Sequence, residues 1–196
     1  DGSDAGGRAT QGAVAEGAQV ANSAVLQPYP SPGGKGEDVL APSAKTQYET
    51  VLDEAALVRL VAELQSAPLV CVDTETDNID SNQARLVGLS FAIRNGHGWY
   101  VPVGHDYLGA PAQLPLQKVL DALRPVLEDP AKPKLGQHIK YDLNVLMRHG
   151  VQVCGVAHDT MLQSYVLDAA GNRHDMDTLA LKYLNHCTIA FSDVAG

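Results

Sequence analysis

Apolar residues follow two periods along this chain, and the change of period separates predicted helices from predicted strands. The first predicted helix has four apolar residues at the spacing of one helix face: Leu57, Leu60, Val61 and Leu64. Asp53 stands where its N-cap is expected, and Pro68 follows its end. The next run, "LVCV" at 69–72, is apolar with two β-branched residues, which is typical of a buried strand. We therefore expect a helix followed directly by a buried strand.

Two further β-rich runs, "RLVGLSFAI" and "GWYVPVG", are joined by the turn-prone pair Asn95-Gly96. The first three strands are therefore expected to form an antiparallel meander. The segment "LQKVLDALRPVLED" then has the pattern of an amphipathic helix, and residues 134–136 form a short strand or loop.

A second amphipathic helix follows, and its predicted apolar face consists of Ile139, Leu143, Leu146 and Met147. Gly150 ends it. Beyond it we expect a strand at 151–156, a helix capped by Asp159 and a last helix near 177–184. Hairpin strands followed by strand–helix alternation predict a mixed α/β sheet flanked by helices, with parallel strands added to the meander; the ribonuclease-H-like fold is one such architecture.

Residues 1–46 have a different composition from the rest of the chain. They are rich in Gly, Ala, Ser and Pro, and Tyr29 is their one aromatic residue, which predicts a disordered linker. The formal charge of the whole chain is −9, of which −7 belongs to residues 47–196. This acidity argues against a broad basic surface for nucleic acid, so any such binding must be local.

Cysteine usage and hydropathy bear on the compartment. Cys71, Cys154 and Cys187 form no CxxC pair and are odd in number, which favours reduced thiols, two of them in the core. No apolar run has membrane-spanning length, and no basic-then-apolar secretory signal is present. We expect a soluble cytoplasmic protein with no membrane partner.

Three acids follow the buried strand on alternate positions: Asp73, Glu75 and Asp77. Alternate residues of a strand share one face, and like charges so close raise one another's pKa unless a cation or a proton relieves them. Carboxylates are hard oxygen ligands suited to Mg²⁺ or Mn²⁺. Asp142, off the predicted apolar stripe of its helix, is the candidate acid from elsewhere in the chain. The acids therefore predict a divalent metal site.

Simpler interpretations exist for each of these acids. Solvated loop carboxylates are the more common account of an isolated D-x-E, and an acid off an apolar stripe is usually solvated too. Asp159, Asp175 and Asp177 are interpreted as helix caps. The seven histidines show no zinc-ligand spacing, and neither GxxxxGK[ST] nor GxSxG occurs.

Several longer segments carry a more specific signal, in matching order and spacing. These are "VDTETDNID", "LVGLSFAI", "YVPVGHDYLGAP", "LGQHIKYDLNVLMRHGV" and "DTMLQSYVLDAAGNRHDMDTLALKYL". They resemble the 3′–5′ proofreading exonuclease domain of bacterial family A DNA polymerases, from about Tyr48 to Gly196. The resemblance implies a ribonuclease-H-like fold over residues 47–196 and two-metal hydrolysis of the terminal phosphodiester at a single-stranded DNA 3′ end.

The resemblance also implies roles for single residues. Asp73, Glu75 and Asp142 would be catalytic and would bind two Mg²⁺ (or Mn²⁺) ions. Ile79 and Phe191 would wedge against the terminal bases, although core packing is the alternative for both. Further contacts with the strand would come from Thr76, Gln137, His138, Tyr141 and Arg173. His138 departs from the asparagine associated with that place.

The family completes its site with a Tyr-x-x-x-Asp motif on a later helix. Neither Tyr165 nor Tyr183 has an acid four residues later. The resemblance places the motif beyond Gly196, so we expect a fragment that is weakly active or inactive, monomeric and without its covalently linked polymerase domain. In the bacterial cell the parent protein would be associated with the nucleoid.

Two other functions stay open at this point. A ribonuclease D-type 3′–5′ exoribonuclease shares the acids, but segments such as "NRHDMDTLA" and "YVPVGHDYLGAP" are associated with the polymerase. A non-catalytic DNA-binding or scaffold domain is the alternative from another class. The presence of Asp73, Glu75 and Asp142 speaks against it, and the missing third motif speaks for it.

Overall fold

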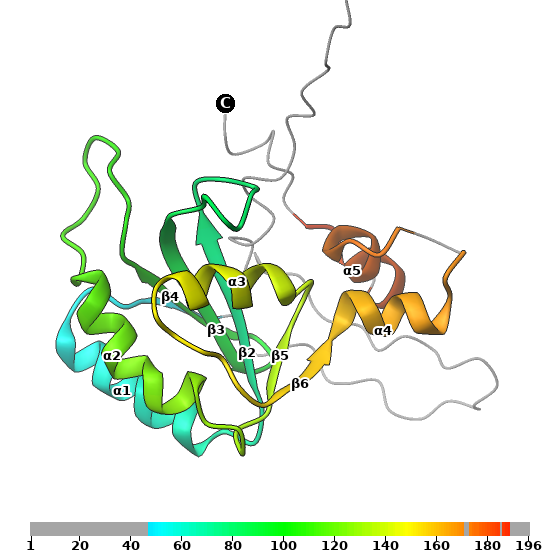
Figure 1. The fold of residues 1–196 in the computed structure, drawn as a ribbon, viewed down its shortest axis with the longest axis horizontal. Coiled ribbons are helices and arrows are strands. Elements are labelled where there is room, and N and C mark those ends of the chain that lie inside the picture. Colours follow the sequence, from blue (N-terminus) through cyan, green and yellow to red (C-terminus); the bar gives the residue numbers. More distant parts are fainter. Residues whose placement is uncertain (1–46, 171–172, 185, 189–196) are drawn as a thin grey trace, which may run out of the picture.

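The computed structural model describes residues 47–170, 173–184 and 186–188. The predictions for residues 1–46 and for Phe191 lie outside this part. Within it the chain forms one mixed sheet with helices (Figure 1). The elements are β1 (Gln47–Thr50), α1 (Glu54–Ser66), β2 (Val70–Thr76), β3 (Leu86–Arg94), β4 (His97–Pro102), α2 (Leu116–Leu127), β5 (Lys134–Gly136), α3 (Lys140–Arg148), β6 (Val156–Asp159), α4 (Thr160–Leu167) and α5 (Met176–Leu184).

The sheet has the strand order β1-β4-β3-β2-β5-β6. Strands β2, β3 and β4 are antiparallel, as the meander pattern predicts. Strands β1, β5 and β6 are added in parallel to β4, β2 and β5. The predicted mixed α/β sheet flanked by helices is therefore confirmed, and the acid-bearing strand β2 lies inside it between β3 and β5.

One core joins the sheet to α1, α2 and α3. Val70 and Val72 of β2 point into it, so by strand alternation Cys71 and Asp73 point to the opposite face. Each buried leucine or valine removes apolar surface from water and contributes on the order of 2 kcal/mol. The apolar side of β2 thus fixes the strand, and its other side is left for polar residues.

Several local signals act as predicted. The Asp53 side chain accepts from the Ala56 backbone N–H at 2.8 Å and caps α1. Gly96 has a φ of 74° in the turn between β3 and β4, and Gly150 has a φ of 77° after α3. Both glycines take the left-handed conformation that side chains disfavour, so these two chain reversals occur where the sequence indicates.

Three expectations about the fold were wrong, and one strand was missed. β1 was not predicted, because its exposed four-residue pattern carries no apolar alternation. The strand expected at 151–156 forms instead at Val156–Asp159, after Gly155 turns the chain with a φ of 71°. Met147, expected in the core, is 61% exposed. Cys71 and Cys154 are half-buried free thiols, not core residues, and Cys187 is exposed.

The error at Met147 has a physical reason. The buried face of α3 contains Val145, Leu146 and Asp142, and this carboxylate is 3% exposed. The buried face of α3 is therefore not the face that apolar residues alone predict. Asp142 takes a place in it, because an acid that finds hydrogen-bond donors can be buried. No described helix is both long and apolar enough to span a bilayer.

Candidate active site

Asp73 and Glu75 point from β2 into a cleft of about 390 Å³. Their strand neighbours on β3 are small, because Asp73 lies opposite Ser90 and Glu75 opposite Gly88. Cβ at Gly88 would lie 2.1 Å from the Tyr100 hydroxyl oxygen, so only glycine admits that ring beside Glu75. The sheet therefore presents both acids on a face whose shape is set by small neighbours.

Asp142 reaches the same cleft from α3. Strand β5 pairs with β2 only at Val70 and Cys71, so the edge of β2 is open beyond that point. There the Thr74 backbone N–H donates to Asp142 Oδ1 at 2.8 Å, and the Thr74 hydroxyl donates to the same oxygen at 2.5 Å. These two bonds fix the third acid against the backbone between the first two. We call Asp73, Glu75 and Asp142 the acidic wall of the cleft.

Burial raises the pKa of all three carboxyls, and repulsion from neighbouring acids adds to it for Asp73 and Glu75. The pKa of Glu75 rises to about 7 through burial and then through Asp142. The pKa of Asp142 rises to about 6 through burial, against the Thr74 hydrogen bonds and His138. The pKa of Asp73 lies well above its ordinary value through burial, Asp142 and Glu75. At neutral pH this wall favours a bound proton or cation.

Two oxygens of the acidic wall, Asp73 Oδ2 and Glu75 Oε1, are buried and accept no hydrogen bond from the described residues. Unpaired buried carboxylate oxygens are costly, and a divalent cation is the partner that hard oxygens prefer. Their donor chemistry therefore fits a metal. In the described ranges, however, no three His, Cys, Asp or Glu side chains converge closely enough to form a complete metal centre.

Asp77 does not join the acidic wall, contrary to the expectation that it shares the face of Asp73. The register of β2 shifts between Glu75 and Thr76, where the strand ends. Asp77 instead forms an ion pair with Arg85, in which Asp77 Oδ2 lies 2.6 Å from Arg85 Nε. Hydrogen bonds from Arg85 lower the pKa of Asp77. The alternation of faces along β2 does not continue past this register shift, so it predicted the wrong face for Asp77.

The loop after β2 carries Ile79 to the cleft. The Tyr141 hydroxyl contacts the Thr76 hydroxyl at 2.5 Å and donates to the Asn78 carbonyl. Ile79 itself is 50% exposed, so core packing does not explain it. The three residues Thr76, Ile79 and Tyr141 therefore line the cleft together.

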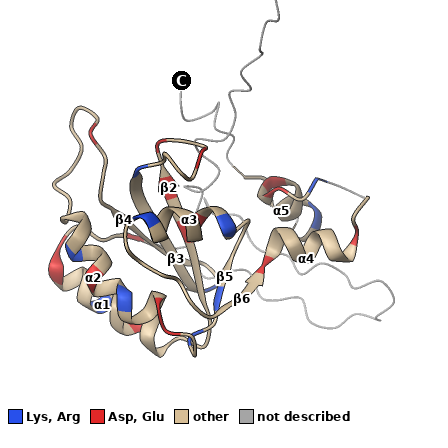
Figure 2. Cartoon of the chain, in the orientation of Figure 1, with Lys and Arg blue, Asp and Glu red and all other residues tan. Residues whose placement is uncertain are grey.

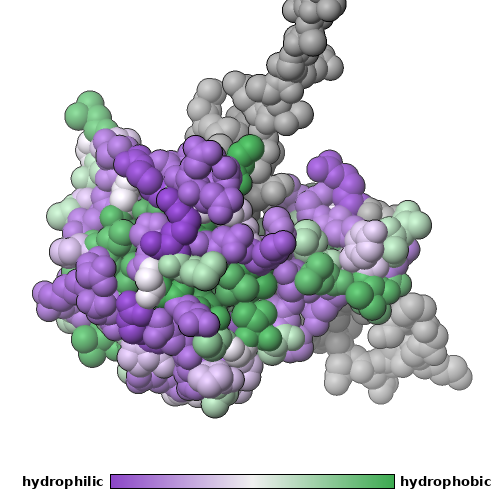
Figure 3. All heavy atoms as spheres, viewed as in Figure 1, coloured by the Kyte–Doolittle hydropathy of each residue, from purple (hydrophilic) through white to green (hydrophobic). Residues whose placement is uncertain are grey.

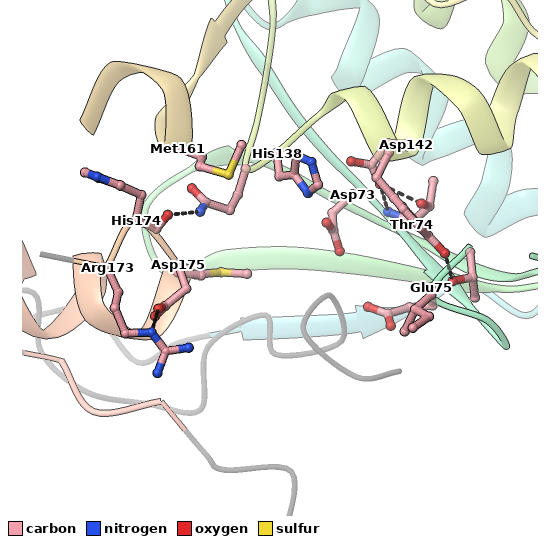
Figure 4. A pocket seen from close by; sticks show the side chains of 14 residues that line it. Asp73, Thr74, Glu75, His138, Asp142, Met161, Arg173, His174 and Asp175 are labelled. Carbon is pink, nitrogen blue, oxygen red and sulfur yellow. Dashed lines mark hydrogen bonds and ion pairs between the residues drawn. The ribbon is translucent and has the colours of Figure 1, made fainter. Parts of the chain in front are cut away.

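The side of the cleft opposite the acids comes from α4, from the segment that leads into α5 and from the first residue of α5, as Figure 4 shows. We call it the helical wall; its residues are Met161, Arg173, His174, Asp175 and Met176. Arg173 is exposed and pairs with Asp175 at 2.9 Å. Gln137 connects this wall to the sheet, since its Nε2 donates to the His174 carbonyl at 2.8 Å.

Nine of the ten residues expected to form the site line this one cleft, and Phe191 lies outside the described part. Sequence reasoning did not assign Thr74 or, on the helical wall, Met161, His174 and Met176. It assigned Asp175 only as a cap, which it is, because it accepts from the Thr178 N–H at 2.8 Å. The available signal for His174 and Met176 was their position one and three residues after Arg173 in "NRHDM".

Charge around the cleft is mixed. Figure 2 shows Lys and Arg interspersed with Asp and Glu and no single basic surface in that view. Arg173 is the basic residue that lines the cleft. The structure thus offers local contacts for an anionic ligand rather than a broad electrostatic footprint.

Comparisons with known proteins point to one family. A family model described as a 3′–5′ exonuclease matches residues 48–196. DNA polymerase I of Pseudomonas aeruginosa is 51% identical over 166 residues, which are 84% of this chain and 18% of that protein. DNA polymerase I of Rhizobium leguminosarum is 39% identical over 79% of this chain and 17% of its own length. The chain thus spans less than a fifth of these relatives.

Solved structures show the same fold at lower identity. The POL domain of Pol1 from M. smegmatis, in complex with DNA primer-template and dNTP, has a TM-score of 0.58, 22% identity and coverage of 70% of this chain and 22% of that one. Trypanosoma brucei RNase D with RNA U12 has a TM-score of 0.59, 17% identity and coverage of 71% and 48%. Brucella melitensis NrnC with bound Mg²⁺ has a TM-score of 0.51 and 19% identity, and the match covers 76% of this chain and 65% of that one.

The fold is that of the ribonuclease-H-like exonucleases, and the family match extends over every element from β1 to α5. The acidic wall lies within the matched residues. The chain therefore belongs to the 3′–5′ exonuclease family and corresponds to the exonuclease domain of DNA polymerase I.

Proposed function

We propose that the cleft binds the 3′ end of a single-stranded DNA and hydrolyses its terminal phosphodiester with two divalent ions, Mg²⁺ or Mn²⁺. The observation that carries this proposal is the pair of buried, unpartnered carboxylate oxygens on Asp73 and Glu75, at one end of an open cleft. Asp142 is the third ligand. Bound divalent ions supply a nucleophilic hydroxide at neutral pH and stabilise charge on the leaving oxygen.

The residues around the acids suit a single strand better than a duplex. Ile79 offers an exposed apolar contact to a terminal base, and Arg173 offers a positive charge to a phosphate. Thr76, Gln137, His138 and Tyr141 supply polar contacts along the path between the two walls. Local stacking and metal-bridged phosphates let an acidic domain hold a polyanion without a basic surface.

The proposed setting is proofreading within a DNA polymerase I. The relatives of this chain carry that name, and their greater length leaves room for a covalently linked polymerase domain that would deliver frayed 3′ ends. A polypeptide of residues 1–196 tested by itself is a slow, monomeric nuclease. Its described acids do not converge into a complete metal centre, and no Tyr-x-x-x-Asp motif occurs in the sequence.

The proposal is tested by digesting a 5′-labelled single-stranded DNA in Mg²⁺. We expect a ladder of products shortened from the 3′ end, abolished by EDTA and reduced about a thousandfold or more by Asp73→Asn. Asp77→Asn is the matched control, because Asp77 lies two residues beyond Glu75 but outside the acidic wall. Equal losses from the two variants, or digestion that survives EDTA, would contradict the proposal.

An exoribonuclease activity is the second candidate, because RNase D structures share the fold. The same assay with an RNA of matching sequence distinguishes the two, and we expect DNA to be the better substrate. A non-catalytic scaffold would bind the oligonucleotide without shortening it, both in this chain and in one extended through the next Tyr-x-x-x-Asp motif.

A further inference from the structure

One residue of the cleft has an unusual backbone. His138, in the turn between β5 and α3, has a φ of 55°, and among the described residues it is the one non-glycine with a positive φ. A side chain in this left-handed region is held there at a cost and persists only where its surroundings impose it. The turn presents Gln137 and His138 to the cleft and begins the helix that carries Asp142.

Asp159, which lies outside the cleft, accepts two hydrogen bonds from the backbone of this turn. Its Oδ1 accepts from the His138 N–H at 3.1 Å, and its Oδ2 accepts from the Ile139 N–H at 3.0 Å. The same carboxylate accepts from Met161 and Leu162 at 3.0 and 3.2 Å and so caps α4. Capping requires only the last two bonds, so the first two represent a separate role.

A neighbouring side chain adds to the connection. The Thr160 hydroxyl donates to Gln137 Oε1 and lies 3.4 Å from the Gly136 carbonyl. Asp159 and Thr160, at the start of α4, therefore form hydrogen bonds with each residue of the turn at 136–139. Asp159 is buried and does not line the cleft, so it can act on a substrate only through the residues that it holds.

We propose that Asp159 is a positioning residue of the exonuclease site: it holds residue 138 in the left-handed conformation and so places Gln137, His138 and the start of α3. The proposal rests on the proposed function for its substrate. Without the carboxylate, the turn relaxes toward negative φ, and the two side chains leave the strand's path.

The decisive variant is Asp159→Asn. It preserves size and leaves Oδ1, which caps α4 and accepts from the His138 N–H, but its amide nitrogen replaces Oδ2 and leaves the Ile139 N–H without an acceptor. Asp53→Asn is the matched control, because Asp53 caps α1 in the same way without contacting the cleft. Each change is made in three backgrounds, namely the unsubstituted chain, His138→Ala and His138→Gly, since glycine alone adopts positive φ freely.

Two measurements are made on each variant. Backbone NMR of residue 138 reports its conformation, and anisotropy of a labelled short single-stranded DNA in Ca²⁺ reports affinity. In the unsubstituted and His138→Ala backgrounds, Asp159→Asn should remove the left-handed signature and weaken binding about tenfold, which matches the strain involved. In the His138→Gly background the signature should persist and the loss should stay below about threefold.

Other results overturn the proposal. A left-handed residue 138 in the Asp159→Asn protein would show that the turn does not depend on both carboxylate oxygens, because the variant removes the bond from the Ile139 N–H to Oδ2. An equal loss of affinity in all three backgrounds, or the same loss from Asp53→Asn, would show general destabilisation instead. If the unmodified chain binds no single-stranded DNA, the proposed function fails, and the NMR result alone still decides whether Asp159 positions the turn.

Discussion

The two walls of the cleft are built in different ways. The acidic wall belongs to the centre of the sheet and to a helix bonded to it, and its Glu75 and Asp142 are buried. The helical wall belongs to α4, to α5 and to the segment just before α5. Both helices stand to one side of the sheet in Figure 1, and the side chain of Arg173 is 85% exposed. Rigid backbone thus carries the acids, while an accessible wall carries the groups for binding.

Apolar exposure shows the same contrast. Figure 3 shows apolar atoms on the surface of α4, where Leu162, Val166 and Leu167 are all exposed, and Leu181 of α5 is exposed as well. The acidic wall, by comparison, is backed by the single core of the sheet with α1, α2 and α3. Substitutions on the acidic wall should therefore change stability and chemistry together, and those on the helical wall should change mainly substrate binding.

The largest expected effect is the pH dependence of the metal-free protein. Burial raises the pKa of Glu75 from 4.5 to about 7, so the folded state holds an extra proton between these values and the free energy of unfolding falls as pH rises. The decrease from pH 4.5 to 7 should be on the order of 3 kcal/mol. Urea unfolding at several pH values measures it, and Mg²⁺ at pH 8 should restore part of it.

Glu75→Gln should make this decrease smaller, because the neutral amide loses no proton, while the raised pKa values of Asp73 and Asp142 keep the rest of it. Asp77→Asn should leave it unchanged, since the lowered pKa of Asp77 places its titration below this window. A protein whose stability rises between pH 5 and 7 would show that Glu75 is not destabilised in its charged form.

A smaller effect is expected from Thr74→Val on the acidic wall. The variant removes the hydroxyl that donates to Asp142 Oδ1, and a hydrogen bond to a buried charged group contributes about 2 kcal/mol. Because Thr74 lowers the pKa of Asp142, that pKa should rise further, which NMR titration measures. Thr50→Val, on β1 and outside the cleft, is the control and should leave that pKa unchanged.

On the helical wall, Arg173→Ala should raise KM for single-stranded DNA about fivefold, or about 1 kcal/mol, with little change in kcat. Its exposed ion pair with Asp175 contributes little to stability, so the melting temperature should hardly move. Arg59→Ala removes a comparable exposed pair with Glu49 and should leave KM unchanged. A loss of kcat alone would place Arg173 with the acids instead.

The smallest effect on substrate binding is expected from Ile79→Ala. Ile79 is half exposed, so the free energy of unfolding should fall by less than about 0.5 kcal/mol while KM rises about twofold. Ile139→Ala is the same substitution at a side chain only 4% exposed, and should cost about 2–5 kcal/mol. Similar losses at both positions would mean that Ile79 is part of the core.

Local patterns predicted much of this molecule. The antiparallel strands β2 to β4, the caps of α1 and α4 and the strand position of Asp73 follow from alternation, caps and glycines that act within a few residues. The resemblance to a known exonuclease added the residues of the cleft, which no local pattern connects. The roles of Asp73, Glu75 and Asp142 as ligands remain predictions.

What the sequence by itself determined is therefore the order of elements from α1 onward, the acids at the end of a buried strand and the family. Only the tertiary structure decided which acids meet. Asp142 turns inward because β5 ends early and exposes the Thr74 N–H, 68 residues away in sequence, while the bulge after Glu75 turns Asp77 outward. The positive φ of His138 likewise depends on a carboxylate 21 residues away. Such contacts depend on where distant segments pack, and no short-range pattern records that.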